Sequence, residues 1–206
     1  MSQFQSALKE FIQDRFSKMG GWCDPAKALD LANLIIDNKA KAIADVGVFE
    51  GKSTVAMAFA CKLLGQGTVY AIDSWSKEDC IEDEAKHNQE YWLSMDLDKN
   101  YENFLSHVVN SNVGRYIDIC KMTSLKASKI VPDLDIVHID ANHAEWPSTS
   151  DVVNWVPKVK VGGFVVMDDV NWPSTQTAIR FVEKCCKLIV KKELNESQFS
   201  IYQKFK

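Results

Sequence analysis

The sequence has no uninterrupted apolar run of the roughly 18 residues that a membrane-spanning helix needs. It has no basic excess either, because 24 Lys and Arg stand against 28 Asp and Glu, for a net charge of −4. General binding to nucleic acid needs a basic face, so this balance argues against it. The start, MSQFQSALKEFIQDRF, is amphipathic and lacks the apolar core of a signal peptide. We therefore expect a cytoplasmic protein that binds neither membranes nor nucleic acid.

Cysteine pairs with the spacing of a metal or redox motif are also missing. The 6 cysteines include no C-x-x-C pair, and no histidine lies near them at the spacing of a zinc site. Cys61 and Cys120 fall in apolar runs, where a thiol behaves as a small buried hydrophobe. A chain of 206 residues can bury a core without crosslinks, so we expect reduced thiols and no disulfide framework.

What the sequence does contain is an alternation of apolar strand-like segments and amphipathic helical segments. Helical spacing predicts an N-terminal helical segment, residues 1–38, that packs on a core domain of residues 39–206. Within that segment, Asp24-Pro25 is a typical helix start. The alternation predicts an α/β fold with a Rossmann-like, doubly wound, mostly parallel seven-stranded sheet and N-terminal helices. The expected strands are 41–47, 67–73, 115–122, 135–140, 162–169, 187–194 and 199–205.

Local signals make two further helix predictions and leave one segment open. Residues 84–109 predict one long helix, and Ser148-x-x-Asp151 resembles a capping box at the start of a later helix. The acidic segment 74–90 is either a solvated face or a mobile lid over a ligand.

Acidic residues stand where the predicted strands end. In open α/β sheets, ligands bind at the carboxyl ends of the strands, near the point where the strand order reverses. We therefore expect a functional site at that edge of the sheet. The acids that close predicted strands are Asp45, Asp73, Asp140, Asp168 and Asp169.

Residues 45–54, DVGVFEGKST, end like a phosphate-binding P-loop but do not fit one. A P-loop has four residues between its glycines, whereas Gly47 and Gly51 enclose three. The carboxylates of Asp45 and Glu50 would also repel phosphates. We interpret KST as the first turn of a helix and the acids as suited to a ligand with hydroxyls and a positive charge. S-adenosylmethionine (SAM) is a nucleoside of that kind without phosphates.

The pattern Asp45-x-Gly47-x-x-x-Gly51 followed by Asp73 resembles the cofactor site of class I SAM-dependent methyltransferases, over residues 40–206. The resemblance implies that the loop contacts the methionine part of SAM and that Asp73 holds the ribose. A plain glycine turn is the alternative interpretation of the loop. The residues implied to bind or flank the cofactor are Asp45, Gly47, Glu50, Gly51, Asp73, Trp75, Thr123, Ser124 and Asp140.

Asp140, Asp168 and Asp169 close neighbouring predicted strands and are expected to converge. Parallel strands lie about 4.8 Å apart, so these carboxylates would repel one another if unpaired. Mg²⁺ or another divalent cation prefers oxygen ligands, would remove the repulsion and would lower the pKa of a bound hydroxyl. His143 follows Asp140 closely, and the pKa of an unperturbed histidine, about 6.5, suits a general base. His138, within the strand, is interpreted as a core histidine.

Asp140-x-x-His143 together with Asp168-Asp169 resembles metal-dependent O-methyltransferases of the catechol and macrolide-sugar types. The resemblance implies that the acids are metal ligands and that His143 is the base, although Ala141-Asn142 departs from the usual pattern. We predict a SAM- and Mg²⁺-dependent O-methyltransferase whose partner is a small hydroxylated molecule, such as a sugar or a natural product. The alternatives are a metal-independent methyltransferase, a SAM-fold binding protein without methyl transfer, and a nucleotide-phosphate enzyme, which the loop disfavours. The acceptor and the oligomeric state stay open.

Overall fold

The computed structural model describes residues 3–194 and 197–206 of the chain. Its strands form one sheet in the order β3-β2-β1-β4-β5-β7-β6. Strands β1 to β5 are parallel, and β7 runs antiparallel between β5 and β6. The predicted fold, a Rossmann-like α/β fold with a mostly parallel seven-stranded sheet, is confirmed. The strands are β1 (Ala42–Val46), β2 (Thr68–Asp73), β3 (Ile117–Lys121), β4 (Leu134–Ile139), β5 (Val159–Met167), β6 (Cys186–Leu194) and β7 (Ser197–Lys204).

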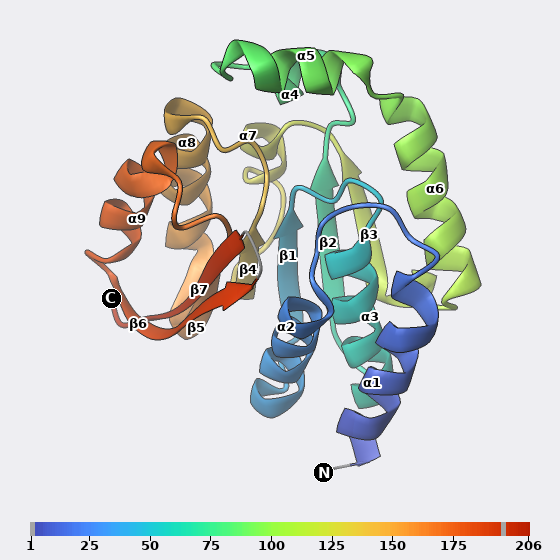
Figure 1. Ribbon diagram of the computed structural model, residues 1–206. Helices are drawn as coiled ribbons and strands as arrows, with labels where there is room; N and C mark the ends of the chain where they lie inside the picture. Colours follow the sequence, from blue (N-terminus) through green and yellow to red (C-terminus); the bar gives the residue numbers. More distant parts are fainter. Residues whose placement is uncertain (1–2, 195–196) are drawn as a thin grey trace.

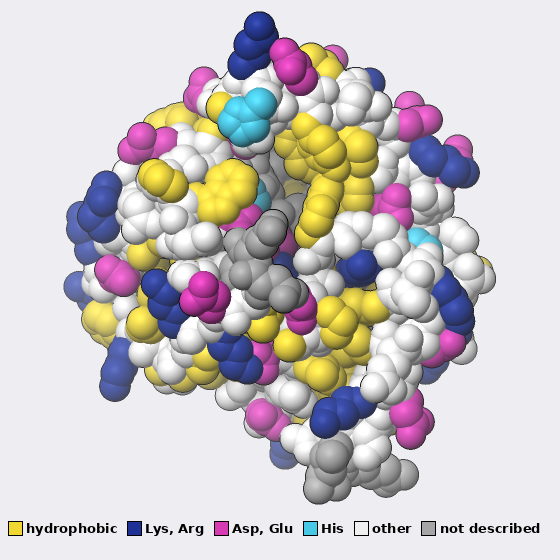
Figure 2. All heavy atoms as spheres, in the orientation of Figure 1, with side chains coloured by type: hydrophobic (Ala, Val, Ile, Leu, Met, Phe, Trp, Pro, Cys, Tyr) yellow, Lys and Arg dark blue, Asp and Glu magenta, His cyan; other side chains and the backbone are white. Residues whose placement is uncertain are grey.

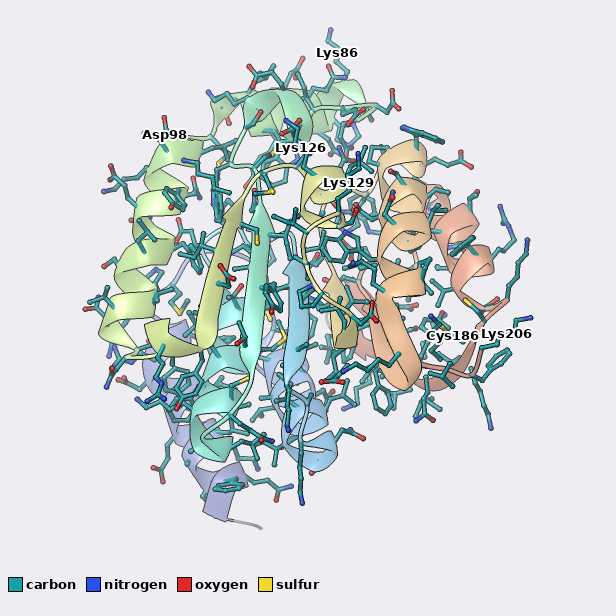
Figure 3. The ribbon with its side chains drawn as sticks, turned by 180° about the vertical axis from the view of Figure 1, so that it is seen from behind. Lys86, Asp98, Lys126, Lys129, Cys186 and Lys206 are labelled. Atoms are coloured by element: carbon teal, nitrogen blue, oxygen red, sulfur yellow. The ribbon has the colours of Figure 1, made fainter. Side chains whose placement is uncertain are left out.

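Helices cover both faces of the sheet, and each face has its own apolar core (Figure 1 and Figure 3). The N-terminal helices share the core of the first face with α3, and the first two residues of the predicted segment 1–38 lie outside the described part. The first face packs against α1 (Gln3–Phe16), α2 (Pro25–Asn38), α3 (Lys52–Leu64) and α6 (Leu97–Asn110). The second packs against α7 (Ser124–Ala127), α8 (Glu145–Trp155) and α9 (Gln176–Val182). Short 3₁₀ turns are η1 (Gly114–Tyr116), η2 (Val156–Lys158) and η3 (Pro173–Thr175).

Two further helices, α4 (Lys77–Cys80) and α5 (Lys86–Ser94), lie across the carboxyl edge of the sheet (Figure 1). They form much of the acidic segment 74–90, and Lys86 points away from the molecule (Figure 3). Figure 2 shows a hollow in the surface below α5, bordered by hydrophobic side chains. The segment therefore has the position that a lid over this edge would need.

The strand order reverses between β1 and β4, which lie side by side at the centre of the sheet. From β1 the order continues to β2 and β3, and from β4 it continues to β5, β7 and β6. Asp45 stands opposite His138 in this register, so the loops that follow β1 and β4 leave the sheet together. This is the crevice in which open α/β sheets bind their ligands.

The predicted start of the second helix is confirmed. Asp24 accepts a hydrogen bond from the N–H of Ala26 at 2.7 Å, and Pro25 occupies the first helical position. All 6 cysteines lie in the described part of the chain and are free thiols, as expected. Among the described helices, none has both the length and the apolar character required to cross a membrane.

The prediction of one long helix over residues 84–109 is wrong. Helix α5 ends at Ser94, and Asp96 accepts a hydrogen bond from the N–H of Lys99 at 3.0 Å at the start of α6. An aspartate at this position caps a new helix more readily than it continues an old one. The break was not predicted because the apolar residues have helical spacing both before and after it.

The capping box at Ser148-x-x-Asp151 is also wrong, because α8 already begins at Glu145. The side chain of Asn142 accepts a hydrogen bond from the N–H of Ala144 at 2.8 Å and shapes the turn before the helix. Asp151 instead lies inside the helix, is buried, and accepts a hydrogen bond from the hydroxyl of Ser124. A buried tertiary partner thus replaces the local cap that the spacing suggested.

Candidate active site

The loop between β1 and α3 depends on its glycines for internal packing. Gly47 has φ +93°, and a Cβ atom there would lie 2.1 Å from the carbonyl oxygen of Asp140. Gly51 has φ +86°, and its Cβ would lie 2.4 Å from the ring of Phe104. Both positions need the left-handed backbone that glycine adopts without strain. The resemblance to SAM-dependent methyltransferases implies that this loop contacts a ligand, whereas the close contacts of Gly47 and Gly51 here are with the protein itself.

Asp45 lies beneath this loop and is fully buried. Its carboxylate accepts hydrogen bonds from the hydroxyls of Ser53 and Thr54 and lies 2.7 Å from Nδ1 of His138. Ser53 and Thr54, which sequence reasoning placed only in a helix turn, are therefore the groups that compensate a buried charge. They anchor the first turn of α3 to β1.

Glu50 connects the loop to two other elements. Its carboxylate accepts hydrogen bonds from the N–H of Gly20 at 2.9 Å and from the amides of Asn100 and Asn103 at 3.1 and 3.0 Å. These partners belong to the α1–α2 connection and to α6. The structure therefore places Glu50 as a link between the loop and these two elements, and its contact with SAM stays a prediction.

Asp73, at the end of β2, holds the backbone of the same loop. Its Oδ2 accepts hydrogen bonds from the N–H groups of Val48 and Phe49 at 3.0 and 2.9 Å, and its Oδ1 accepts one from Trp75 at 2.8 Å. Burial raises the pKa of Asp73 above its ordinary value, although these three hydrogen bonds oppose the rise. A carboxylate oxygen can accept two hydrogen bonds, so Oδ1 retains a lone pair for a ligand hydroxyl.

Three of the residues implied to bind or flank the cofactor, Trp75, Thr123 and Ser124, have partners within the protein. Trp75 is 5% exposed, packs on the rings of Tyr101 and Phe104, and donates its indole N–H to a backbone carbonyl of the loop. Thr123 caps α7. Ser124 donates to Asp151 and accepts from the indole of Trp155 at 2.7 Å. Their role toward a cofactor stays a prediction.

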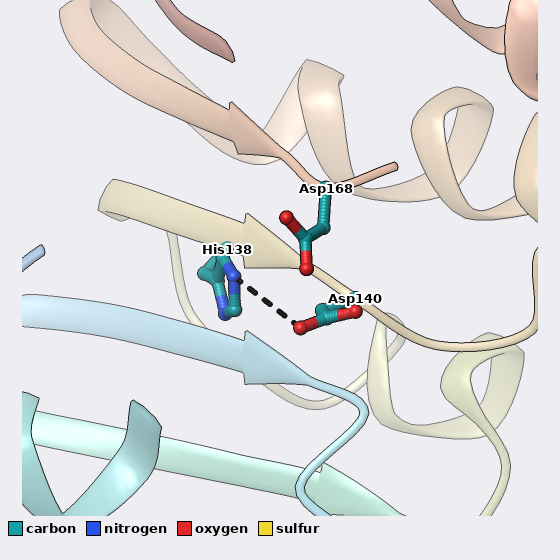
Figure 4. A group of neighbouring side chains, drawn as sticks. All are labelled: His138, Asp140 and Asp168. Carbon is teal, nitrogen blue, oxygen red and sulfur yellow. Dashed lines mark ion pairs between the residues drawn. The ribbon is translucent and has the colours of Figure 1, made fainter. Parts of the chain in front are cut away.

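The ends of β4 and β5 bring Asp140 and Asp168 together, as expected (Figure 4). Each offers an oxygen that, with a ring nitrogen of His138, forms a group of atoms within 4.8 Å of one another. His138 is buried, as a core histidine would be, but sequence reasoning missed its place in this group. Asp169, the third predicted ligand, is not in this group; it has φ +45°, and its Oδ2 lies 3.3 Å from Nε2 of His143.

A buried lysine lies between the two carboxylates. The ammonium of Lys27 lies 2.8 Å from Oδ2 of Asp140 and donates a hydrogen bond to Asp168. Lys27 stands on α2, four and eight residues before Leu31 and Ile35 of its buried face. This spacing places Lys27 in line with the buried apolar residues of α2. Because a lysine is rarely buried without a charged partner, the spacing could have predicted that Lys27 pairs with an acid.

The charges in this group influence one another strongly. Burial alone would raise the pKa of Asp140, but the positive charges of Lys27 and His138 hold that pKa below its ordinary value. Burial and the charge of Asp140 raise the pKa of Asp168 to about 7. Burial would lower the pKa of Lys27, yet Asp140 and its other neighbours raise it well above its ordinary value. The ammonium therefore stays charged.

The donor set fits a divalent cation only in part. Oxygen and imidazole ligands are suitable, and among the described residues Oδ1 of Asp168 and Nε2 of His138 have no hydrogen-bond partner. The ammonium of Lys27, however, lies between Asp140 and Asp168 and would repel a second cation at contact distance. With Lys27 in this position, the site does not fit a divalent cation.

His143 lies on the loop after β4, beside this group. Its Nε2 is 3.7 Å from Oδ1 of Asp140 as well as 3.3 Å from Asp169, and its ring packs 5.2 Å from that of Trp172. The amide of Asn142 donates to the carbonyl of Glu82 at 2.9 Å and so ties this loop to the segment that carries α4 and α5. The arrangement presents an imidazole, backed by carboxylates, beneath that segment.

The sequence profile of a family described as "Methyltransferase domain" matches residues 44–170, which is more than half of the chain. The chain belongs to the methyltransferase domain family. The matched region contains the glycine loop, Asp73, Asp140, His143 and the Asp168-Asp169 pair. The resemblance inferred from the sequence is thereby confirmed at the level of the family.

Solved methyltransferase structures share this fold at low sequence identity. The O-methyltransferase TomG from Streptomyces achromogenes, in complex with SAM, has a TM-score of 0.67 at 16% identity, over 100% of this chain and 91% of that one. An O-methyltransferase from Bacillus cereus, in complex with S-adenosylhomocysteine (SAH), has a TM-score of 0.64 at 15% identity, over 97% and 91%. SAH-bound PaMTH1 from Podospora anserina has a TM-score of 0.62 at 11% identity, over 100% and 89%. A search of curated proteins found no significant match.

The methyltransferase has a cavity of about 350 Å³ whose lining includes Ala144, the residue that follows His143. Trp172, which packs on the His143 ring, lines it, so the cavity and the predicted base share a wall. The walls come from the acidic segment before and within α5, from the start of α8 and from η3. The lining residues are Asp83, Glu84, Ala85, His87, Asn88, Ala144, Glu145, Trp172 and Ser174.

Replacing Asp73 by alanine is expected to weaken SAH binding at least about tenfold, or about 1.4 kcal/mol. The substitution removes the acceptor of three backbone N–H groups and the lone pair available to a ribose hydroxyl. Loss of the acceptors should also lower the free energy of unfolding by about 2 kcal/mol. Calorimetric titration with SAH and urea unfolding measure the two effects, with Asp118→Ala on the exposed side of β3 as the control. Unchanged SAH affinity in Asp73→Ala would contradict the assignment.

Proposed function

We propose that this methyltransferase transfers the methyl group of SAM to a hydroxyl group of a small molecule. The observation that carries the proposal is the His143–Asp169 pair on the loops that follow β4 and β5, next to Trp172, which lines a cavity of about 350 Å³. Family membership supports SAM as the methyl donor, as do the SAM- and SAH-bound structures with the same fold.

In this proposal His143 acts as the general base, and Asp169 and Asp140 support it. SAM supplies a methyl group bonded to a positively charged sulfur. His143 would take the proton of the acceptor hydroxyl, and Asp169 and Asp140, at 3.3 and 3.7 Å from its Nε2, would stabilise the imidazolium. This orientation leaves Nδ1 as the atom that accepts the proton. Methyl transfer then depends mainly on the alignment of oxygen, methyl group and sulfur.

The cavity walls indicate the chemical class of the acceptor. Asp83, Glu84 and Glu145 make them acidic, and Trp172 supplies an aromatic surface. An anionic acceptor would be repelled there, so we propose a neutral or cationic one with an apolar face. Sugars and natural-product hydroxyls belong to this class.

The predicted dependence on Mg²⁺ is not part of this proposal. Lys27 provides the positive charge between Asp140 and Asp168 that a metal was expected to supply. The metal-independent alternative is therefore favoured, and we expect methylation to continue in the presence of EDTA.

Titration with SAH, followed by a screen of hydroxylated acceptors for SAH production, tests the proposal. We expect SAH to bind and at least one neutral or cationic alcohol to be methylated. Absence of SAH binding would contradict the proposal at its first step. SAH binding without turnover on any acceptor would favour a SAM-fold binding protein instead.

A further inference from the structure

We propose that Lys27 is the resident cation of this site and that its ammonium positions Asp140 against His143 without a divalent metal. The positioning role rests on the proposed function, because it assigns His143 as the base. The occupancy of the cation site by Lys27 does not rest on the proposed function and can be tested without SAM or an acceptor.

The first support is the geometry of three elements that are distant in sequence. Lys27 reaches Asp140 and Asp168 across separations of 113 and 141 residues, from α2 to the ends of β4 and β5. Its side chain is 4% exposed, and that of Asp168 is 6% exposed, so water screens this contact poorly. A mobile surface lysine would not be held in this way.

The second support is the connection to His143. One oxygen of Asp140 contacts the ammonium of Lys27 at 2.8 Å, and its other oxygen lies 3.7 Å from Nε2 of His143. Lys27 therefore fixes the carboxylate that faces the imidazole. Lys27 itself acts through Asp140, which makes it a positioning residue.

The third support is the balance of charge. Without Lys27, Asp140 and Asp168 would be two neighbouring carboxylates beside Nε2 of His138, and both Nε2 and one oxygen of Asp168 lack a hydrogen-bond partner within the described chain. Such a group binds a hard divalent cation readily. Asp140 and Asp168 lie within residues 44–170, the region that matches the family, whereas Lys27 lies outside this region.

Binding of Mn²⁺, measured by the loss of the free-ion electron paramagnetic resonance signal, tests the proposal. We expect the wild-type protein to bind Mn²⁺ no more tightly than a variant with Asp168→Asn. Lys27→Met keeps most of the length of the side chain but removes the ammonium group, and this variant should bind Mn²⁺ at least about tenfold more tightly. Lys27→Arg retains the charge and should behave like the wild type.

Two results would overturn the proposal. One is tight binding of Mn²⁺ to the wild-type protein that Asp168→Asn abolishes, because a metal would then displace the lysine. The other is a folded Lys27→Met that gains no affinity for Mn²⁺. A failure of SAH binding or of methylation would affect neither measurement.

A poorly folded Lys27→Met would still be informative. The double variant Lys27→Met/Asp168→Asn removes the repulsion that the lysine compensates, so its urea midpoint should exceed that of Lys27→Met. Mn²⁺ should likewise raise the midpoint of Lys27→Met and leave that of the wild type unchanged. A double variant no more stable than the single one would mean that Lys27 does not compensate the charge of Asp168, which contradicts the proposal.

Discussion

Replacing His143 by alanine is expected to lower turnover by about 10²- to 10⁴-fold, the usual contribution of a general base. SAH affinity should stay unchanged, because His143 is not among the residues assigned to the cofactor, most of which follow β1, β2 and β3. The ring contacts Trp172, Asp140 and Asp169, and it is 19% exposed, so its removal leaves space for a small base. Steady-state rates of SAH production, with the acceptor identified by the screen, measure the effect.

Two controls separate base chemistry from packing. His143→Gln fills much of the same space without a titratable group, and its loss of turnover should be similar. Added imidazole should restore part of the rate of His143→Ala but not that of His143→Gln, because only alanine leaves room for it. Full turnover of His143→Gln would contradict the assignment of His143 as the base.

Replacing Asp151 by asparagine is expected to stabilise the protein at alkaline pH and to change its pH dependence. Asp151 is buried in α8, where it accepts a hydrogen bond from Ser124, and burial raises its pKa to about 7. In the unfolded chain the pKa of an aspartate is about 3.9. At a pH between these two pKa values, the carboxyl of Asp151 is protonated in the folded protein and ionised in the unfolded chain. The free energy of unfolding therefore falls as the pH rises through this window, and it levels off above about 7.

The size of the effect follows from the width of the window. When the pH is raised from 5 to 8, ionisation of Asp151 should lower the free energy of unfolding of the wild-type protein by about 3 kcal/mol, at about 1.36 kcal/mol per pKa unit. The asparagine side chain of Asp151→Asn would be neutral throughout and would still accept the hydrogen bond from Ser124, so this variant should lack the pH-dependent component. Urea unfolding at intervals between these pH values measures the difference between the two proteins.

Asp37→Asn is the matched control, because it makes the same change at an exposed position near the end of α2. Its unfolding free energy should follow that of the wild type across the range. If the difference between Asp151→Asn and the wild type did not grow with pH, Asp151 would not titrate near neutrality in the folded protein.

Much of this molecule follows from local patterns in the sequence. Apolar segments alternating with amphipathic ones determine the α/β class, because buried parallel strands must be apolar along their whole length. Asp24-Pro25 starts α2 through contacts within a single turn. Asp140 and Asp168 could be expected to meet because each follows the end of a strand, and the carboxyl ends of parallel strands share one edge of a sheet.

The partner of each charge was decided by the tertiary structure. Lys27 approaches Asp140 and Asp168 only after α2 has packed on the sheet, across more than a hundred residues of chain. The hydroxyls of Ser53 and Thr54 compensate Asp45, and Asp169 lies 3.3 Å from His143 rather than in the group of Asp140 and Asp168. Local sequence therefore determines which residues stand at the edge of the sheet. Long-range packing decides which cation neutralises them, because a buried charge takes its partner from whatever element the fold brings beside it.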